Sequence, residues 1–269
     1  MPLLTGTQLY GWGQVYARDG QRIEDHYEEV LATVRDIGMD TAERVLGDLD
    51  AAGVRAWADL LRANDLAPAS LYAGGALHET EAARRTCDHL IALAPTLVEA
   101  GFRVLNVNPD PIGREKTADE LTIQAAAIQR LGEGLRSEGI ALGLHNHTPE
   151  MVNAAREFHH NLRNTSAEAV GLCMDWHWCW RGGSDPWELW ETYGNRVVSF
   201  HLRQSRDGIW TEAFEDGDLD YRPLIHQLVQ RDFSGPVLLE LALEDGTPQT
   251  RTAAENHRLS FEYLRSLLP

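Results

Sequence analysis

The sequence has few cysteines, no basic leader segment and no long apolar run. Its cysteines, Cys87, Cys173 and Cys179, are odd in number and have no paired spacing, which argues against a disulfide scaffold. We expect buried thiols that behave as small hydrophobic side chains, although Cys173 and Cys179 could approach a metal. No stretch approaches about 20 apolar residues, and the N-terminal residues lack the pattern of a signal peptide. We therefore expect a cytoplasmic protein with no membrane partner.

Basic residues are also scarce relative to acidic ones. The chain has 24 Lys and Arg against 41 Asp and Glu, a formal net charge of −17. Such acidity opposes binding to nucleic acids, which requires a basic face that displaces counterions. It says little about a small neutral substrate, because the charge at a binding site can differ from the total. Oligomeric state is not indicated, and a homo-oligomer is left open.

A glycine-rich dinucleotide fingerprint is missing after the first expected strand. Gly11-Trp-Gly13 lacks the third glycine, and we expect a loop rather than a helix over Tyr10–Gln14. A doubly wound open sheet is the alternative architecture, and this absence argues against it.

The sequence does contain short apolar runs that alternate with segments whose apolar residues recur at helical spacing. This alternation is typical of a parallel α/β fold. The expected strands are Leu3–Leu9, Met39–Leu46, Leu66–Tyr72, Phe102–Val107, Ile140–Asn146, Val170–Asp175, Val197–Leu202 and Val237–Leu241. The expected helices are Gln21–Ile37, Leu49–Asn64, Glu79–Ala100, Thr117–Glu138, Met151–Leu162, a helix from Asp185 to near Gly194, Tyr221–Gln230 and Gln249–Leu268. Eight such units in 269 residues predict a single (β/α)8 TIM barrel domain over residues 1–269.

Four expected strands carry a carboxylate or a histidine at or just past their carboxyl ends. These groups are Glu150, Asp175, His201 and Glu240. Because the carboxyl ends of parallel strands converge on one mouth of a barrel, the four side chains could share one metal ion. Three carboxylates and one imidazole suit Mn²⁺, Mg²⁺ or Co²⁺ better than a thiolate zinc site would. We expect one divalent ion, Mn²⁺ first, with Mg²⁺, Co²⁺ and Zn²⁺ as alternatives.

Short motifs surround these groups. They are His145-Asn-His-Thr-Pro-Glu150, Met174-Asp-Trp-His-Trp178, Gly182-Gly-Ser-Asp-Pro186, Asn195-Arg-Val-Val-Ser-Phe-His-Leu202, Asp216-Gly-Asp-Leu-Asp220 and Val237-Leu-Leu-Glu240. As a set they resemble the xylose isomerase-like barrels, which include sugar isomerases, ketose 3-epimerases, inosose dehydratases and endonuclease-IV-type enzymes. The resemblance covers nearly the whole chain. It implies a divalent metal on the four groups and a carboxylate among them that moves a proton next to a carbonyl.

The chain departs from the family pattern at two places. Many members have Glu where this chain has His145, so His145 or His147 could be the ligand in place of Glu150. Many members continue strand seven as His-Leu-Lys-Asp, whereas this chain has His201-Leu-Arg-Gln204. Arg203 keeps the positive charge on a forked group, which favours binding of an anionic or vicinal-diol group of the substrate.

Several other side chains are candidates for substrate binding. Sugars stack their C–H faces on aromatic rings, and packing in the core is the alternative for each ring. The alternative for His177 is an imidazole packed behind the site without substrate contact, and the alternative for Glu43 is a structural carboxylate bonded to a neighbouring strand. The full set of substrate-binding candidates is His145, His147, His177, Arg203, Trp176, Trp178, Trp12 and Glu43.

These features predict an enzyme that acts on a small sugar or polyol. Divalent-metal-dependent isomerisation or epimerisation of a ketose or keto-polyol through a metal-stabilised enediolate is the leading hypothesis, with Glu150 and Glu240 as the proton-transferring pair. A dehydratase or lyase, of the inosose dehydratase type or one that eliminates from a keto-glycoside, uses the same proton abstraction and is the alternative. A carbohydrate-binding barrel without activity and a DNA-repair endonuclease are less favoured, the last because of the acidic charge.

Overall fold

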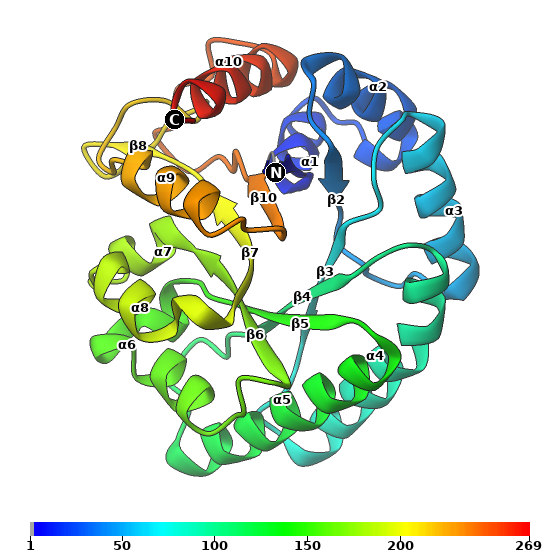
Figure 1. Ribbon diagram of the computed structural model, residues 1–269, viewed down its shortest axis with the longest axis vertical. Helices are drawn as coiled ribbons and strands as arrows, with labels where there is room; N and C mark the ends of the chain where they lie inside the picture. Colours follow the sequence, from blue (N-terminus) through cyan, green and yellow to red (C-terminus); the bar gives the residue numbers. More distant parts are fainter. Residues whose placement is uncertain (1–2) are drawn as a thin grey trace. The chain divides into compact units, whose positions relative to one another are not determined.

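The computed structural model describes residues 3–269, and eight of its strands form one sheet (Figure 1). The order in the sheet is β2-β1-β10-β7-β6-β5-β4-β3. The strands are β1 (Leu4–Gln8), β2 (Thr41–Glu43), β3 (Ser70–Gly75), β4 (Val104–Pro109), β5 (Ala141–His145), β6 (Val170–Asp175), β7 (Val197–Leu202) and β10 (Pro236–Leu239). A separate antiparallel hairpin consists of β8 (Ser205–Arg206) and β9 (Ile209–Trp210).

Helices alternate with these strands, as predicted. They are α1 (Tyr10–Arg18), α2 (Tyr27–Ile37), α3 (Ala51–Ala63), α4 (Thr80–Glu99), α5 (Ala118–Glu138), α6 (Thr148–Arg163), α7 (Trp176–Arg181), α8 (Pro186–Tyr193), α9 (Arg222–Gln230) and α10 (Ala253–Ser266). Short 3-10 turns cover Ile23–His26 and Gly194–Arg196. Within residues 3–269, no helix is both long enough and apolar enough to cross a membrane.

The described chain divides into two compact units. Unit one contains residues 3–45, Ala58–Ala69 and His201–Pro269, and unit two contains Leu46–Trp57 and Ser70–Phe200. In unit one, β1 pairs in parallel with β2 and with β10, and α10 packs against α2. In unit two, β3, β4, β5 and β6 pair in parallel in that order, and α4 packs along α5 (Figure 1).

Local sequence signals explain where several helices begin and end. Thr117 and Glu120 form a capping box at the start of α5, and Gly139 ends this helix at φ 94°, a left-handed conformation that glycine adopts without strain. Asp185 caps α8 by accepting a hydrogen bond from the Trp187 amide at 2.8 Å. The predicted starts and stops of α5 and α8 are therefore confirmed to within a residue.

Two helices lie where the sequence predicted none. Residues Tyr10–Arg18 form α1, not a loop. Gly11 packs closely against the segment that follows β10, since a Cβ there would lie 2.2 Å from the Leu241 carbonyl oxygen. Trp176–Arg181 form α7, which Asp175 caps. At α1, Gly11 is required for close packing between two segments and does not indicate a loop. At α7, Asp175 was not recognised as an N-cap from the sequence.

The interior of unit two has a defined layer of polar side chains. Ser199 on β7 donates a hydrogen bond to Asn106 Oδ1 on β4 at 2.6 Å, and a Cβ on Gly143 of β5 would lie 2.3 Å from the same oxygen. Because side chains alternate along a strand, residues two positions further along β4 and β5 also face the interior. Asn108 and His145 therefore occupy the next layer, toward the carboxyl ends of their strands.

Candidate active site

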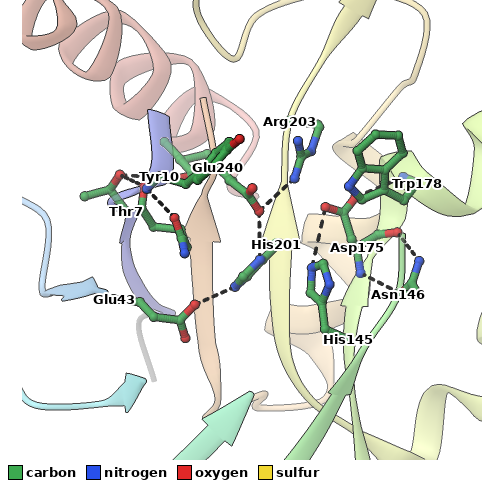
Figure 2. Close-up of polar contacts among 12 residues, drawn as sticks. Thr7, Tyr10, Glu43, His145, Asn146, Asp175, Trp178, His201, Arg203 and Glu240 are labelled. Atoms are coloured by element: carbon green, nitrogen blue, oxygen red, sulfur yellow. Dashed lines mark hydrogen bonds and ion pairs between the residues drawn. The ribbon is translucent and has the colours of Figure 1, made fainter. Parts of the chain in front are cut away.

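His201, at the end of β7, lies between two buried carboxylates in unit one (Figure 2). Its Nδ1 is 2.9 Å from Glu240 Oε2, and its Nε2 is 2.8 Å from Glu43 Oε1. Glu43 ends β2, and Glu240 directly follows β10. Two carboxylates of unit one thus contact one imidazole of the same unit. Glu43, expected to contact substrate or to be structural, is bonded to His201.

Arg203 adds a positive charge to this cluster. Its Nη2 lies 2.7 Å from Glu240 Oε2, and its guanidinium carbon lies 4.6 Å from the centre of the Trp210 ring (Figure 2). The Tyr221 hydroxyl donates to the Arg203 carbonyl oxygen at 2.6 Å, which fixes the backbone. Arg203 is buried, so its charge and that of Glu240 interact strongly. We refer to Glu43, His201, Arg203 and Glu240 as the His201 cluster.

A second group of polar side chains lies in unit two, at the ends of β5 and β6. His145 Nε2 is 3.8 Å from Asp175 Oδ2, and both side chains are fully buried (Figure 2). Asp175 Oδ1 accepts from the Trp178 amide at 2.9 Å and so caps α7. Asn146 locks the neighbouring backbone, since its amide donates to the Asp175 carbonyl and accepts from the Asp175 N–H, each at 3.1 Å. We call His145, Asn146 and Asp175 the Asp175 cluster.

Glu150 lies in the first turn of α6, not at a strand end. Its Oε2 accepts from the His147 amide at 2.7 Å and closes a capping box with the His147 side chain. Its Oε1 is buried and has no hydrogen-bond partner among residues 3–269. Burial raises the pKa of Glu150 to about 7, the His147 N–H opposes this rise, and the nearby charge of Glu157 adds to it. Glu150 can therefore exchange a proton near neutral pH.

The segment that follows Glu150 has an unusual backbone. Asn153, Ala154 and Ala155 all adopt left-handed conformations with φ between 53° and 55°. Such residues are strained unless the surroundings hold them. Here Arg156 donates to the Lys116 carbonyl at 2.8 Å, and buried Lys116 pairs with Glu157 at 2.7 Å. The loop before α5 thus holds the start of α6, and with it Glu150, in place.

The aromatic candidates differ in their surroundings. Trp176 is 2% exposed and meets the edge of the Trp187 ring at a centroid distance of 4.8 Å. Trp12 stacks on buried His257 at 4.4 Å. These contacts favour the packing interpretation for Trp176 and Trp12.

The remaining aromatic candidates are His147, Trp178 and His177, and the first two lie near His145 of the Asp175 cluster. The His147 ring is 4.5 Å from that of His145 and 5.7 Å from that of Trp178. His177 is fully buried and lies edge-on to Trp180 at 5.3 Å. His147 and Trp178 are therefore the aromatic candidates nearest to His145, and their substrate contacts stay predictions. Asn146 was not among the candidates, although it lies inside the His145–Glu150 motif.

All three cysteines are buried thiols, as expected. Asp218 accepts hydrogen bonds from the Ser205 hydroxyl at 2.6 Å and from the Asp207 and Gly208 amides at 3.0 and 2.8 Å, which closes the β8–β9 hairpin.

Comparison with known proteins identifies the family. Residues 31–267 match the model of the xylose isomerase-like TIM barrel. The chain belongs to this family. The xylose isomerase-like barrel therefore has the predicted single (β/α)8 architecture, to which the eight-stranded sheet and its alternating helices conform.

The chain is similar in sequence to several named relatives and similar in fold to several solved structures. An inosose dehydratase of Geobacillus kaustophilus (strain HTA426) is 24% identical over 185 residues, which cover 60% of this chain and 59% of that protein. This xylose isomerase-like barrel spans only about half to three-fifths of the length of the first curated relatives it matches. A sugar phosphate isomerase/epimerase from Parabacteroides distasonis ATCC 8503 has a TM-score of 0.76 at 19% identity, covering 98% of this chain and 93% of that chain. A D-allulose 3-epimerase from Methylomonas sp., in complex with D-allulose, has a TM-score of 0.76 at 18% identity and covers 98% and 96%.

Proposed function

We propose that this protein is a divalent-metal-dependent isomerase or epimerase of a ketose or related keto-polyol. The observation that carries the proposal is the buried Glu150 carboxyl, with its pKa near 7 and one oxygen that has no protein partner within residues 3–269. A general base works best when its pKa is close to the operating pH. The solved structures similar in fold include sugar epimerases, which supports a substrate of this class.

We propose His145, Asp175, His201 and Glu240 as the metal ligands. In a TIM barrel the carboxyl ends of the strands line one mouth, and these groups end or follow β5, β6, β7 and β10. Two imidazoles and two carboxylates fit Mn²⁺ and also suit Co²⁺ or Zn²⁺. The set contains His145 where Glu150 was first expected, because Glu150 is engaged at the start of α6. When bound, the ion would polarise a substrate carbonyl and the hydroxyl beside it.

The contacts of each residue suggest its role. Ionised Glu150 removes the proton from the carbon next to the carbonyl, which gives an enediolate. Glu240, held by Arg203 and His201, returns a proton to the neighbouring carbon or to the other face. Glu43 fixes the His201 ring through Nε2, the kind of carboxylate contact that orients histidine in metal sites. Arg203 holds Glu240 and binds the substrate through its forked guanidinium group.

Dehydration of an inosose-like keto-polyol is a second candidate, favoured by the curated relatives, which are inosose dehydratases. The first step is the same removal of a proton next to the carbonyl. The hydroxyl on the next carbon then leaves as water after it accepts a proton, and protonated Glu150 can supply that proton because its pKa is near 7.

Solvent isotope labelling separates the candidates. The metal-loaded protein is incubated in deuterated buffer with D-allulose and other ketoses, inososes and keto-glycosides, and the products are followed by NMR. Deuterium at the carbon next to the carbonyl supports isomerisation or epimerisation, and loss of water with an enone that absorbs ultraviolet light supports dehydration. If neither appears with any substrate while metal is fully bound, the proposal is wrong.

A further inference from the structure

Asn108, near the end of β4, is a buried polar residue that the proposed chemistry does not use. Its side chain is 5% exposed in total. Its Nδ2 donates to the Pro109 carbonyl oxygen at 2.8 Å, whereas its Oδ1 is buried with no hydrogen-bond partner among residues 3–269. Leaving a buried acceptor unpaired costs free energy, which a donor from outside the chain would recover.

The hydrogen bond to Pro109 fixes which atom is which. A carbonyl oxygen only accepts, so the amide atom that faces it must be the NH₂ nitrogen. The other end of the Asn108 amide is then an oxygen, which can accept hydrogen bonds but cannot donate one. A hydroxyl or an N–H satisfies this oxygen, whereas a ketone or a phosphate oxygen does not.

The strand register places this oxygen in the interior layer of His145. Val107 pairs with Leu144, so Asn108 is level with His145, and both face the interior by the alternation described above. On the other neighbouring strand the partner of Asn108 is Gly74, and a Cβ at Gly74 would lie 3.1 Å from Asp110 Oδ1. Asn108 therefore presents an acceptor beside a proposed metal ligand, and its neighbour on β3 is the exposed Gly74.

We propose that Asn108 accepts a hydrogen bond from a free hydroxyl of the sugar or polyol and thereby determines which substrates bind. This inference rests on the proposed function, since it assumes a polyhydroxylated substrate near His145. It adds that the substrate position at Asn108 carries an unmodified hydroxyl. A deoxy or phosphorylated group there would leave Oδ1 buried and unsatisfied, and sites built for a hydroxyl reject analogues that lack it.

The test compares Asn108→Leu with a matched control, Asn161→Leu. Asn161 is also a buried asparagine of unit two, but its Oδ1 already accepts from Gln124 at 3.1 Å. The wild type and both variants, loaded with Mn²⁺, are assayed with D-allulose, an inosose and the monodeoxy analogues of each. We expect the wild type to disfavour one monodeoxy analogue by about 10- to 100-fold in kcat/KM, and Asn108→Leu to lose that preference while Asn161→Leu keeps it. Metal content should be equal in all three proteins.

Binding of the same compounds, measured by calorimetry, gives a readout that does not need turnover. If the wild type binds the polyols and Asn108→Leu loses the preference for the hydroxyl, Asn108 has the proposed role even where no reaction is seen. Absence of turnover defeats the proposed function alone. If the preference survives in Asn108→Leu, or disappears equally in Asn161→Leu, or if no polyol binds, the inference about Asn108 is wrong.

Discussion

The His201 cluster and the start of α6 hold buried carboxylates in opposite ways. Glu240 is in contact with a guanidinium and an imidazole, and Glu43 with the other nitrogen of that imidazole. Glu150 receives one backbone N–H, and burial raises its pKa to about 7. Charged or polar partners stabilise an ionised carboxylate, whereas an apolar environment leaves it ready to take up a proton. The comparison suggests that charged and polar partners hold Glu240 in position, whereas burial prepares Glu150 to take up a proton near neutral pH.

The largest expected effect comes from Glu150→Gln, which removes the exchangeable proton and keeps the side-chain shape. We expect kcat to fall by about 100- to 10,000-fold, the range for loss of a general acid or base, with metal content unchanged. Steady-state kinetics with the substrate found by isotope labelling would measure this.

Glu255→Gln is the matched control for this change. Glu255 closes the capping box of α10 as Glu150 closes that of α6, but it is exposed. Turnover should be unchanged in Glu255→Gln. Equal loss in both variants would mean that the Glu150 effect comes from capping and not from proton transfer.

The proposed ligand role of Asp175 and Glu240 is tested by metal content. We expect the double variant Asp175→Ala, Glu240→Ala to lose most of its bound divalent ion, because two of the four proposed ligands are gone. Elemental analysis after dialysis would measure the loss. Asp185→Ala is a suitable control, since Asp185 also caps a helix with its carboxylate. Full metal occupancy in the double variant would contradict the proposed ligand set.

The pH dependence of the free energy of unfolding tests whether burial raises the pKa of Glu150. The pKa of Glu150 is about 7 in the folded protein and 4.5 as its ordinary value. A raised pKa in the folded state stabilises the protonated protein, so the contribution is complete below pH about 4.5 and is lost as pH rises to about 7. Its size is at most about 3 kcal/mol.

Urea unfolding of the metal-free protein at pH 4.5 and pH 8 would measure this contribution. The wild type should lose more stability across this range than Glu150→Gln does. All other titrating groups are common to both proteins, so the difference between them isolates Glu150. Equal losses would show that Glu150 ionises at its ordinary pKa.

Much of this arrangement follows from sequence, for physical reasons that particular residues make clear. Val170–Asp175 and Val197–Leu202 are strands with the predicted bounds, because their apolar runs are flanked by polar residues. Asp175, His201 and Glu240 end or follow strands, as expected. Glu150 was expected at a strand end, but β5 stops at His145 and the capping box starts α6 instead.

What sequence could not predict depends on contacts between distant segments. Local pattern does not indicate that Glu43 bonds to His201, 158 residues away. The left-handed residues Asn153–Ala155 follow no glycine signal, since the contacts of Arg156 and Glu157 with Lys116 hold that turn. The missing hydrogen-bond partner of Asn108 Oδ1 among residues 3–269 likewise depends on the tertiary neighbours of Asn108, which the sequence does not give.

The smallest expected effect concerns Arg203, which contacts Glu240 and is proposed to bind the substrate. Arg203→Lys keeps the positive charge beside Glu240 but loses the planar group over Trp210 and its forked hydrogen bonds. Because the charge is retained, we expect metal content to stay unchanged and KM to rise by about tenfold, the equivalent of one good hydrogen bond. Kinetics and elemental analysis on the same preparation would test both parts. Arg206→Lys, a substitution at an exposed arginine of the same strand extension, should leave KM unaltered. Loss of metal from Arg203→Lys would instead show that this arginine supports the ligand set through Glu240. Arg203 would then belong with the groups that hold the metal and not with those that bind the substrate.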